Sequence, residues 1–438
     1  MQGLLPPAAH RLPERARGAS RRSQRARQWP LGPGLITGAC NNDPSSVGTY
    51  SQVGAQFGFG LSWTLLFSYP LVVAIQEISA RIGHVTGRGI AGNLQRHYPP
   101  WLACALVALL SGANVFNLAA DLGAMGVVMK LTAGGPALLW VCLLGLACML
   151  LGVLTARGRY VRLLKWSSLC LLSYVVSAFL VDVPWREVGS AMIRPSLSAS
   201  PQYLTAILAV LGTTISPYLF FWQAQQEAEA AAPAPGTTPA PRLAMQARAE
   251  FARIRLDTLT GMGLSSVVAL CILITTASTL HVHGVQAIRT AAEAAEALRS
   301  VAGNFTFGVF ALGLLGAGLL TVPPLAASAA YALGEVLPAG RRGRRPARSR
   351  SFYAAIVAAA ALGGALNFTS ITPMQALYGS AVLNGVVCLP LMLMIMHLAT
   401  RTRLAGAVRL PLRLVALGWA ATAVMACGVL ALAACAFG

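Results

Sequence analysis

The feature that most constrains this chain is a series of apolar runs, each about 20 residues long, that recurs from Leu31 to the C-terminus. A helix of about 20 apolar residues can cross the ~30 Å hydrocarbon core of a bilayer. Hydrophobic residues make up 56% of the sequence and charged residues only 11%. The runs predict a multi-pass membrane protein embedded in a lipid bilayer. The eleven predicted spans are 31–57, 61–80, 101–129, 137–155, 163–181, 203–226, 259–280, 305–336, 352–366, 374–398 and 412–436.

The basic residues give a formal net charge of +20, but they are dispersed among the loops. Nucleic-acid binding requires clustered Lys and Arg, so we expect no nucleic-acid partner. If the N-terminus is cytoplasmic, nearly all of the 33 Lys and Arg residues fall on cytoplasmic segments. The exceptions are Lys130, Arg186, Arg194, Arg289 and Arg299. The positive-inside rule therefore predicts a cytoplasmic N-terminus and an extracytoplasmic C-terminus.

The first 28 residues are Arg-rich and nearly free of acids, a composition that organellar transit peptides share. A disordered basic cytoplasmic tail explains the same residues. We favour the tail, and with it a bacterial inner membrane as the location.

Two of the apolar runs are interrupted near their centres. They are "GPGLITGACNNDPSSVGTYSQVGAQ" (32–56) and "LTAILAVLGTTISPYLFFWQAQQEAE" (204–229), with Pro44 and Pro217 flanked by hydroxyl residues. A half-helix of a dozen residues covers only ~18 Å, too little to cross alone. We therefore expect both helices to unwind near mid-membrane.

The interrupted helices are the first and the sixth, five crossings apart, so two such units have opposite orientations in the membrane. Paired broken helices in an inverted repeat are typical of the binding site of a secondary transporter. The expected organisation is a tail (1–28) followed by a transporter domain (29–438). Within that domain we expect repeat one at about 31–182, repeat two at about 201–399, a flexible Ala/Pro-rich cytoplasmic loop at 229–253 and an extra helix at about 412–436.

Asp43 lies inside the first interruption, next to Pro44. Unwound backbone at membrane depth persists only where it is buried in protein or lines a cavity. A carboxylate beside exposed carbonyls predicts a cation site. The alternative is that Pro44 only kinks the helix and that Asp43 makes a local hydrogen bond.

Three segments carry a family resemblance, namely residues 32–63, 76–99 and 211–229. They read "GPGLITGACNNDPSSVGTYSQVGAQFGFGLSW", "QEISARIGHVTGRGIAGNLQRHYP" and "LGTTISPYLFFWQAQQEAE". They resemble the NRAMP family of divalent metal transporters, in particular a divergent bacterial branch related to magnesium and manganese transporters. The likeness runs in order from about Leu31 to at least His397. It implies an all-α, LeuT-type fold with a 5+5 inverted repeat, alternating access, a divalent metal ion as substrate and no resident cofactor.

The resemblance also implies site residues. The family signature Asp-Pro-Gly-Asn corresponds to Asp43, Pro44, Ser45 and Ser46, so the acid is kept and an amide becomes a hydroxyl. The family's Met-Pro-His corresponds to Ser216, Pro217 and Tyr218, and a second histidine corresponds to Gln223. The family's acidic pair in helix three appears as Asp121 and Ala124. The carbonyls of Cys40 and Thr213 should face the ion.

The substitutions bear on the transported ion. Thioether sulfur favours softer metals, whereas carboxylate, carbonyl and hydroxyl oxygens suit Mg²⁺ and Mn²⁺. The expected site is therefore hard, with Mg²⁺ or Mn²⁺ favoured over Fe²⁺ and Cd²⁺. Asn384 could add an amide ligand, or it could make an interhelical hydrogen bond instead.

Proton coupling is open. Asp121 and Glu77 are candidate coupling groups, but Glu77 could equally pair with Arg81 one turn on. Coupling is not required, because a divalent cation entering down a 100 mV inside-negative potential gains roughly 4.6 kcal/mol.

Two rival functions are weighed. A carrier of an organic cation or amino acid with the same fold is the nearer one, although Asp43 would repel a substrate carboxylate. A membrane-embedded enzyme is the more distant one, because the sequence shows no nucleophile-base set and no metal triad that would support catalysis. We expect a transporter rather than an enzyme, and a monomer.

Overall fold

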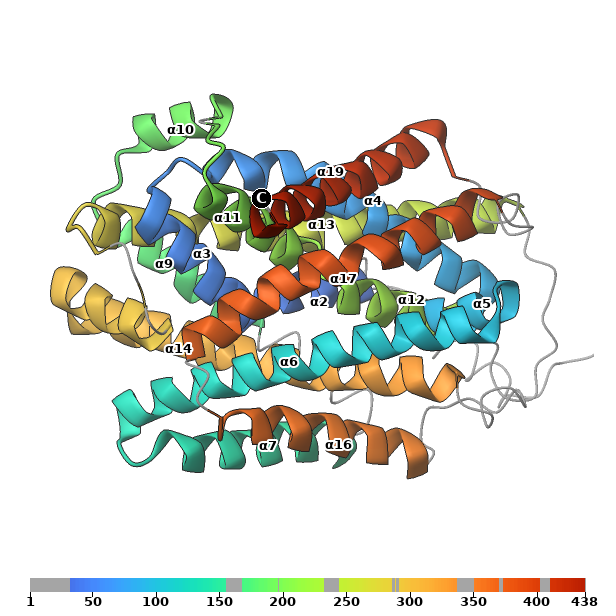
Figure 1. The fold of residues 1–438 in the computed structure, drawn as a ribbon, viewed down its shortest axis with the longest axis horizontal. Coiled ribbons are helices and arrows are strands. Elements are labelled where there is room, and N and C mark those ends of the chain that lie inside the picture. The colour runs from blue at the N-terminus through green and yellow to red at the C-terminus, as the bar shows by residue number, and fades with distance from the viewer. Residues whose placement is uncertain are drawn as a thin grey trace, which may run out of the picture.

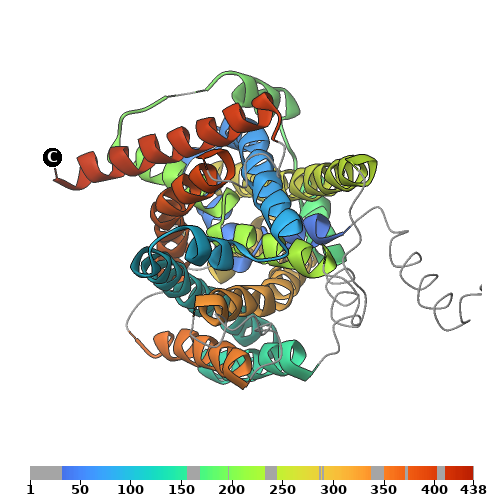
Figure 2. The ribbon, with the colours of Figure 1, turned by 90° about the vertical axis from the view of Figure 1, so that its right-hand side faces the viewer.

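The computed structural model describes residues 32–154, 168–195, 197–231, 244–285, 288, 291–336, 350–369, 373–401 and 410–437. Within these residues the regular structure is helical and no strand occurs, which confirms the predicted all-α class. The helices form a bundle that is elongated in Figure 1 and seen closer to end-on in Figure 2. In chain order the elements are α2 (Pro33–Cys40), α3 (Pro44–Phe57), α4 (Ser62–Thr86), α5 (Ile90–His97), α6 (Pro100–Ala133), α7 (Ala137–Leu154), η1 (Ser168–Leu171), α9 (Leu172–Phe179), α10 (Trp185–Ile193), α11 (Pro201–Thr214), α12 (Pro217–Ala231), α13 (Ala244–Thr276), η2 (Ala277–His281), α14 (Ala291–Val336), α16 (Arg350–Leu366), α17 (Pro373–Arg401) and α19 (Leu412–Phe437).

The described part of the chain contains seven helical segments that are long and apolar enough to cross a membrane, with α11 and α12 counted together as one segment. Three shorter apolar helices, Ala137–Leu151, Leu169–Phe179 and Ala354–Leu366, coincide with further predicted spans. The remaining predicted span, 31–57, is divided between α2 and α3. Each predicted span thus has a helical counterpart, and the number of crossings stays a prediction. The predicted tail at 1–28 lies outside the described residues.

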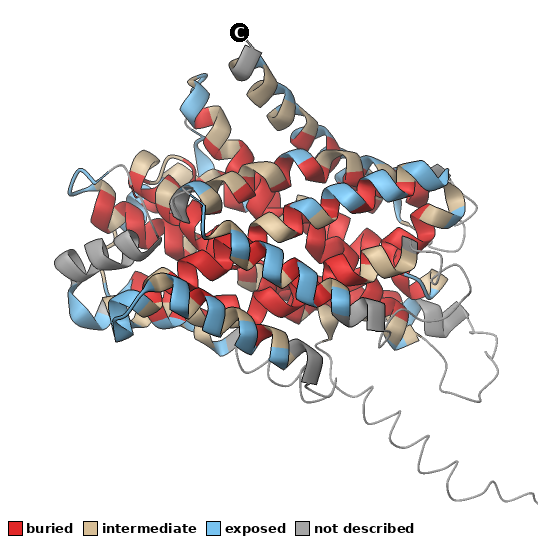
Figure 3. Cartoon of the chain, turned by 60° about the horizontal axis from the view of Figure 1, so that its bottom comes forward, coloured by how far each residue is buried: buried red, intermediate tan, exposed pale blue. Residues whose placement is uncertain are grey.

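The outer surface is apolar, as expected of a bundle in lipid. Figure 3 shows buried residues concentrated in the interior and exposed ones on the outer helices. On α7, four leucines at helical spacing are 45% to 50% exposed: Leu139, Leu143, Leu146 and Leu150. A leucine stripe of this kind is unfavourable in water and neutral against lipid tails, which supports membrane embedding.

Glycines set the position of α2. This helix packs on α13, and a Cβ at Gly38 would overlap the backbone of Gly261. A Cβ at Gly34 would likewise lie 2.8 Å from the backbone of Asp257 and Thr258. Small residues at such a crossing let two membrane helices approach closely. Close packing therefore fixes α2 against α13.

One boundary differs from the prediction. The loop expected to be flexible over 229–253 is helical at both ends, because α12 continues to Ala231 and α13 begins at Ala244. The sequence from Ala244 to Asp257 is rich in Ala and Arg, which are good helix formers. Helix propensity therefore extends α13 beyond its apolar segment. Residues 232–243 lie outside the described part.

Candidate functional site

The first break in the bundle lies between α2 and α3. α2 ends at Cys40 and α3 begins at Pro44. Proline is suited to the first turn of a helix because its missing N–H would have no helical partner there. Asp43 has extended backbone angles (φ −70°, ψ 167°) and accepts a hydrogen bond from the Ser46 N–H at 2.7 Å. Asp43 is therefore the N-cap of α3.

The second break lies between α11, which ends at Thr214, and α12, which begins at Pro217. Ile215 leaves the helical region with φ −106° and ψ 67°. The hydroxyl of Ser216 donates to the carbonyl oxygen of Thr213 at 2.8 Å. The family resemblance implied that this carbonyl faces the ion, and the structure gives it a hydroxyl partner.

Direct hydrogen bonds join the two breaks. The hydroxyls of Ser46 and Thr213 are 2.5 Å apart. The Tyr218 hydroxyl donates to the Cys40 carbonyl at 2.7 Å. The structure thus brings together five of the predicted ligand residues and Ser216, which contacts Thr213. The five are Asp43, Ser46, Cys40, Thr213 and Tyr218.

The Asp43 carboxylate is 2% exposed. Its Oδ1 accepts from the Ser45 hydroxyl at 2.9 Å and from the Ser46 hydroxyl at 2.6 Å, besides the Ser46 N–H. These donors are neutral, and Asp43 takes part in none of the ion pairs among the described residues. A buried carboxylate without a cationic partner is costly, so a bound cation would stabilise it.

A second carboxylate lies beside the first. Asp121 on α6 is fully buried, and its Oδ1 accepts from the Ser45 N–H at 3.0 Å. Its Oδ2 has no hydrogen-bond partner within the described part of the chain. Ser45 therefore contacts both acidic side chains, with its hydroxyl on Asp43 and its N–H on Asp121. Ala124, at the position of the family's second acid, is buried and apolar.

The other two predicted residues have structural partners. Asn384 on α17 exchanges two amide hydrogen bonds with Asn117 on α6, at 3.0 and 3.2 Å. This is the interhelical bond that the sequence left open. Glu77 forms a buried ion pair with Arg81 one turn along α4. The pairing of Glu77 that the sequence offered as an alternative is thus present.

The donor atoms that surround Asp43 are oxygens. Among the described residues, no group of three or more His, Cys, Asp and Glu side chains is placed to hold a metal. What surrounds Asp43 instead is hydroxyl and carbonyl oxygen. Such a donor set suits hard cations that keep part of their water shell.

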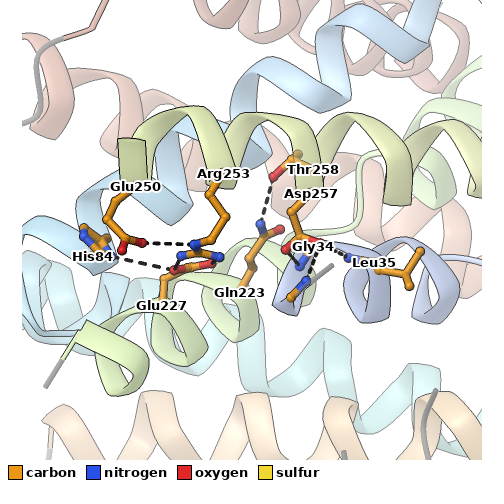
Figure 4. A network of polar contacts seen from close by, with 10 residues as sticks. Gly34, Leu35, His84, Gln223, Glu227, Glu250, Arg253, Asp257 and Thr258 are labelled. Carbon is orange, nitrogen blue, oxygen red and sulfur yellow. Dashed lines mark hydrogen bonds and ion pairs between the residues drawn. The ribbon is translucent and has the colours of Figure 1, made fainter. Parts of the chain in front are cut away.

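A polar network between α2, α12 and α13 was not identified from the sequence (Figure 4). α2 has no side-chain cap of its own, and Asp257 of α13 serves instead. Its carboxylate accepts from the N–H groups of Gly32 and Gly34, both at 2.7 Å, and of Leu35 at 3.1 Å. Asp257 thus caps α2 from a neighbouring helix, where the α2 dipole favours a negative charge.

The same network continues along α12. Fully buried Glu227 pairs with Arg253 at 2.6 Å, and Arg253 also pairs with Glu250 at 3.0 Å. Gln223, at the position of the family's second histidine, donates to Thr258 at 3.0 Å. Glu227 lies one residue beyond the predicted span 203–226, and Arg253 is the last residue of the predicted loop 229–253. One sequence signal could have pointed to a capping residue such as Asp257. The half-helix that became α2 begins with "GPG" at 32–34, which offers no side chain to cap its N-terminus.

Comparison with known proteins gives one family. A family model described as natural resistance-associated macrophage protein-like (Nramp) matches residues 34–434. The chain is 27% identical over 310 residues to a divalent metal cation transporter, MntH, of Yersinia enterocolitica. That match covers 68% of this chain and 71% of the relative.

Solved structures share the fold. A manganese transporter of Eremococcus coleocola, crystallised with an aromatic bis-isothiourea compound, matches with a TM-score of 0.69 at 17% identity, covering 92% of this chain and 86% of that one. Mhp1, a nucleobase-cation-symport-1 family transporter with bromovinylhydantoin bound, matches with a TM-score of 0.60 at 15% identity, covering 92% and 93%. At these identities the likeness shows the fold alone, and it confirms the predicted LeuT-type architecture.

Proposed function

Because the chain belongs to the Nramp family, we propose that it is a secondary transporter of divalent metal cations rather than an enzyme. The observation that carries the proposal is the buried Asp43 carboxylate. It lies in the first helix break, which hydrogen bonds join to the second, and it is surrounded by neutral oxygens without a cationic partner in the described chain. The MntH relative, named as a divalent metal cation transporter, supports the same substrate class.

The ligand chemistry supports Mg²⁺ or Mn²⁺ over Fe²⁺ and Cd²⁺. Ser216 stands where the family resemblance expects a thioether, so that position lacks the soft sulfur that favours Cd²⁺. The Cys40 thiol at the first break donates to the Leu320 carbonyl instead. Hydroxyl and carbonyl oxygens from both breaks would complete the coordination together with retained water. In this proposal the Asp43 carboxylate binds the ion directly. Ser46 next to the first break and Thr213 next to the second contribute oxygen ligands to the same ion.

Asp121 is the residue that proton coupling would use, because it is close to Asp43 through Ser45 and has an unpartnered oxygen within the described chain. Glu77 is structural, since it is paired with Arg81. We propose that the ion flux does not depend on protons, because the membrane potential alone can drive a divalent cation inward.

Alternating access would take place around this site. α2 packs on α13 and is capped by Asp257, so an opening that moves α2 away from α13 would break the three N–H bonds to Asp257. We place the protein in a bacterial inner membrane as a monomer with a cytoplasmic N-terminus. A same-fold organic-cation or amino-acid carrier is the alternative, and the likeness to Mhp1 leaves it open at the level of fold.

Uptake into proteoliposomes tests the proposal. The purified full chain should take up Mg²⁺ and Mn²⁺ with saturation, and Asp43→Ala should abolish both uptake and binding. Asp182→Ala, which removes an exposed carboxylate, is the matched control and should behave as wild type. Micromolar Cd²⁺ binding without Mg²⁺ or Mn²⁺ transport would refute the ion preference. Saturable uptake of an organic cation alone would refute the substrate class.

A further inference from the structure

Asn42 is a buried amide with one unused end. It lies directly before Asp43, in the non-helical stretch between α2 and α3, and it is fully buried. Its Nδ2 donates to the Ser265 hydroxyl at 3.1 Å, while its Oδ1 has no hydrogen-bond partner within the described chain. An unsatisfied buried acceptor costs about 1–3 kcal/mol. A partner from outside the described part of the chain would therefore stabilise this oxygen.

Neighbouring hydrogen bonds fix which end of Asn42 is free. Of the two orientations of the Asn41 amide, one pairs both of its ends. In that orientation its nitrogen donates to the carbonyls of Thr213 and Thr214, at 3.3 and 3.2 Å, and its oxygen accepts from the Ser265 hydroxyl at 2.9 Å. Ser265 has a single hydrogen and gives it to Asn41, so its oxygen can only accept from Asn42. The Asn42 nitrogen must therefore face Ser265, which leaves the Asn42 oxygen free.

We propose that Asn42 Oδ1 is a further ligand of the transported divalent cation. The inference rests on the proposed function. Asn42 and Asp43 are consecutive in the non-helical segment, and an amide oxygen is a ligand that hard divalent cations accept. The family's amide ligand is replaced by the hydroxyl of Ser46, so Asn42 would return an amide to the site from the other side of Asp43. Ser265 and Asn41 act as positioning residues.

The proposal predicts a selective loss of affinity in Asn42→Ala. Residues that only orient a metal ligand already contribute about 10–100-fold to metal affinity, so loss of the ligand should weaken Mg²⁺ and Mn²⁺ binding at least tenfold. The measurement is isothermal titration of the purified full chain with each ion. Cd²⁺ affinity should fall less, because a soft ion gains less from an amide oxygen. A general structural defect would weaken all three ions alike.

Asn114→Ala is the matched control. Asn114 on α6 is also fully buried with an unpartnered Oδ1 among the described residues, but its amide contacts the Leu325 carbonyl, at 3.4 Å. Its loss should leave the dissociation constants unchanged. If Asn42→Ala fails to fold, Ser265→Ala provides the second test. It leaves residue 42 intact and frees its amide to rotate, so Mg²⁺ binding should again weaken.

The outcomes separate the two claims. A wild-type protein that binds neither Mg²⁺ nor Mn²⁺ overturns the proposed function and this inference with it. Wild-type binding together with an unchanged dissociation constant in Asn42→Ala overturns the inference and leaves the proposed function standing.

Discussion

At the scale of single residues, Ser45 holds the acidic part of the site together. Its hydroxyl donates to Asp43 and its N–H donates to Asp121, so two buried carboxylates share one residue. Two ionised carboxylates without a cationic partner in the described chain repel each other unless one of them takes up a proton or positive charge enters the site. The binding of a divalent cation supplies that charge.

The first residue-scale prediction concerns sulfur. Ser216→Met should tighten Cd²⁺ binding by on the order of tenfold, or about 1.4 kcal/mol, because it returns a thioether to the second break. Mg²⁺ binding should not tighten. The measurement is isothermal titration with both ions. Ser216→Leu adds similar bulk without sulfur, and equal Cd²⁺ tightening in that variant would show that sulfur is not the cause.

The second concerns Glu77. Glu77→Gln removes one partner of the buried ion pair with Arg81, and breaking a buried pair costs up to about 3–5 kcal/mol. We expect a lower melting temperature in detergent and unchanged Mg²⁺ affinity. If the variant melts like wild type but its transport loses all dependence on pH, Glu77 is a coupling group and the structural assignment is wrong.

Sequence alone could indicate Asp43 but not Asn42. A carboxylate inside an apolar run stands out in any sequence. The free end of Asn42 becomes visible only through Ser265, 223 residues away in the chain. The same limit applies to Asn384, whose two alternatives could be separated only when Asn117 was found opposite it. Pairings across helices depend on packing, which no local pattern encodes.

At the scale of elements, α2 depends on another helix for its start. The half-helix is eight residues long and has no side-chain cap of its own. Isolated helices of that length are marginal, so its stability comes from packing on α13 and from Asp257. The proline-marked breaks were predictable because Pro44 and Pro217 each begin a helix. The start of α13 at Ala244 could not be predicted from hydropathy, because hydropathy identifies apolar segments and the first turns of α13 are polar.

Removal of the cap should loosen α2 selectively. Asp257→Ala leaves three N–H groups without their acceptor, at a cost of about 1–3 kcal/mol for each buried group left unpaired. We expect faster hydrogen–deuterium exchange over residues 33–40 and little change in α6. Exchange that rises equally in both helices would indicate global destabilisation, and unchanged exchange would mean that the cap does not hold α2.

At the scale of the whole molecule, hydropathy and charge gave the class and the predicted direction of insertion. The predicted number of spans rests on the length of each apolar run. A helix can extend beyond its apolar run, as α13 does by beginning at Ala244. The fold came from the resemblance of the motifs and is shared with transporters at only 15% to 17% identity. Backbone architecture is thus retained at low sequence identity. Ion choice must therefore be argued from the site.

A potential should drive transport. An inside-negative potential of 100 mV contributes roughly 4.6 kcal/mol to a divalent cation, equivalent to a gradient of about two thousandfold. We expect a potassium diffusion potential to raise Mn²⁺ uptake severalfold without acidifying the vesicle lumen. A pH-sensitive dye inside the vesicles measures this. Acidification that scales with Mn²⁺ uptake and disappears in Asp121→Asn would establish proton coupling instead.

The most direct measurement is anomalous diffraction from crystals of the protein grown with Mn²⁺. The account predicts a peak within about 2.5 Å of a carboxylate oxygen of Asp43, with oxygen ligands from both helix breaks around it. A saturated Mn²⁺ peak bound elsewhere, with the Asp43 carboxylate free of metal, would contradict it.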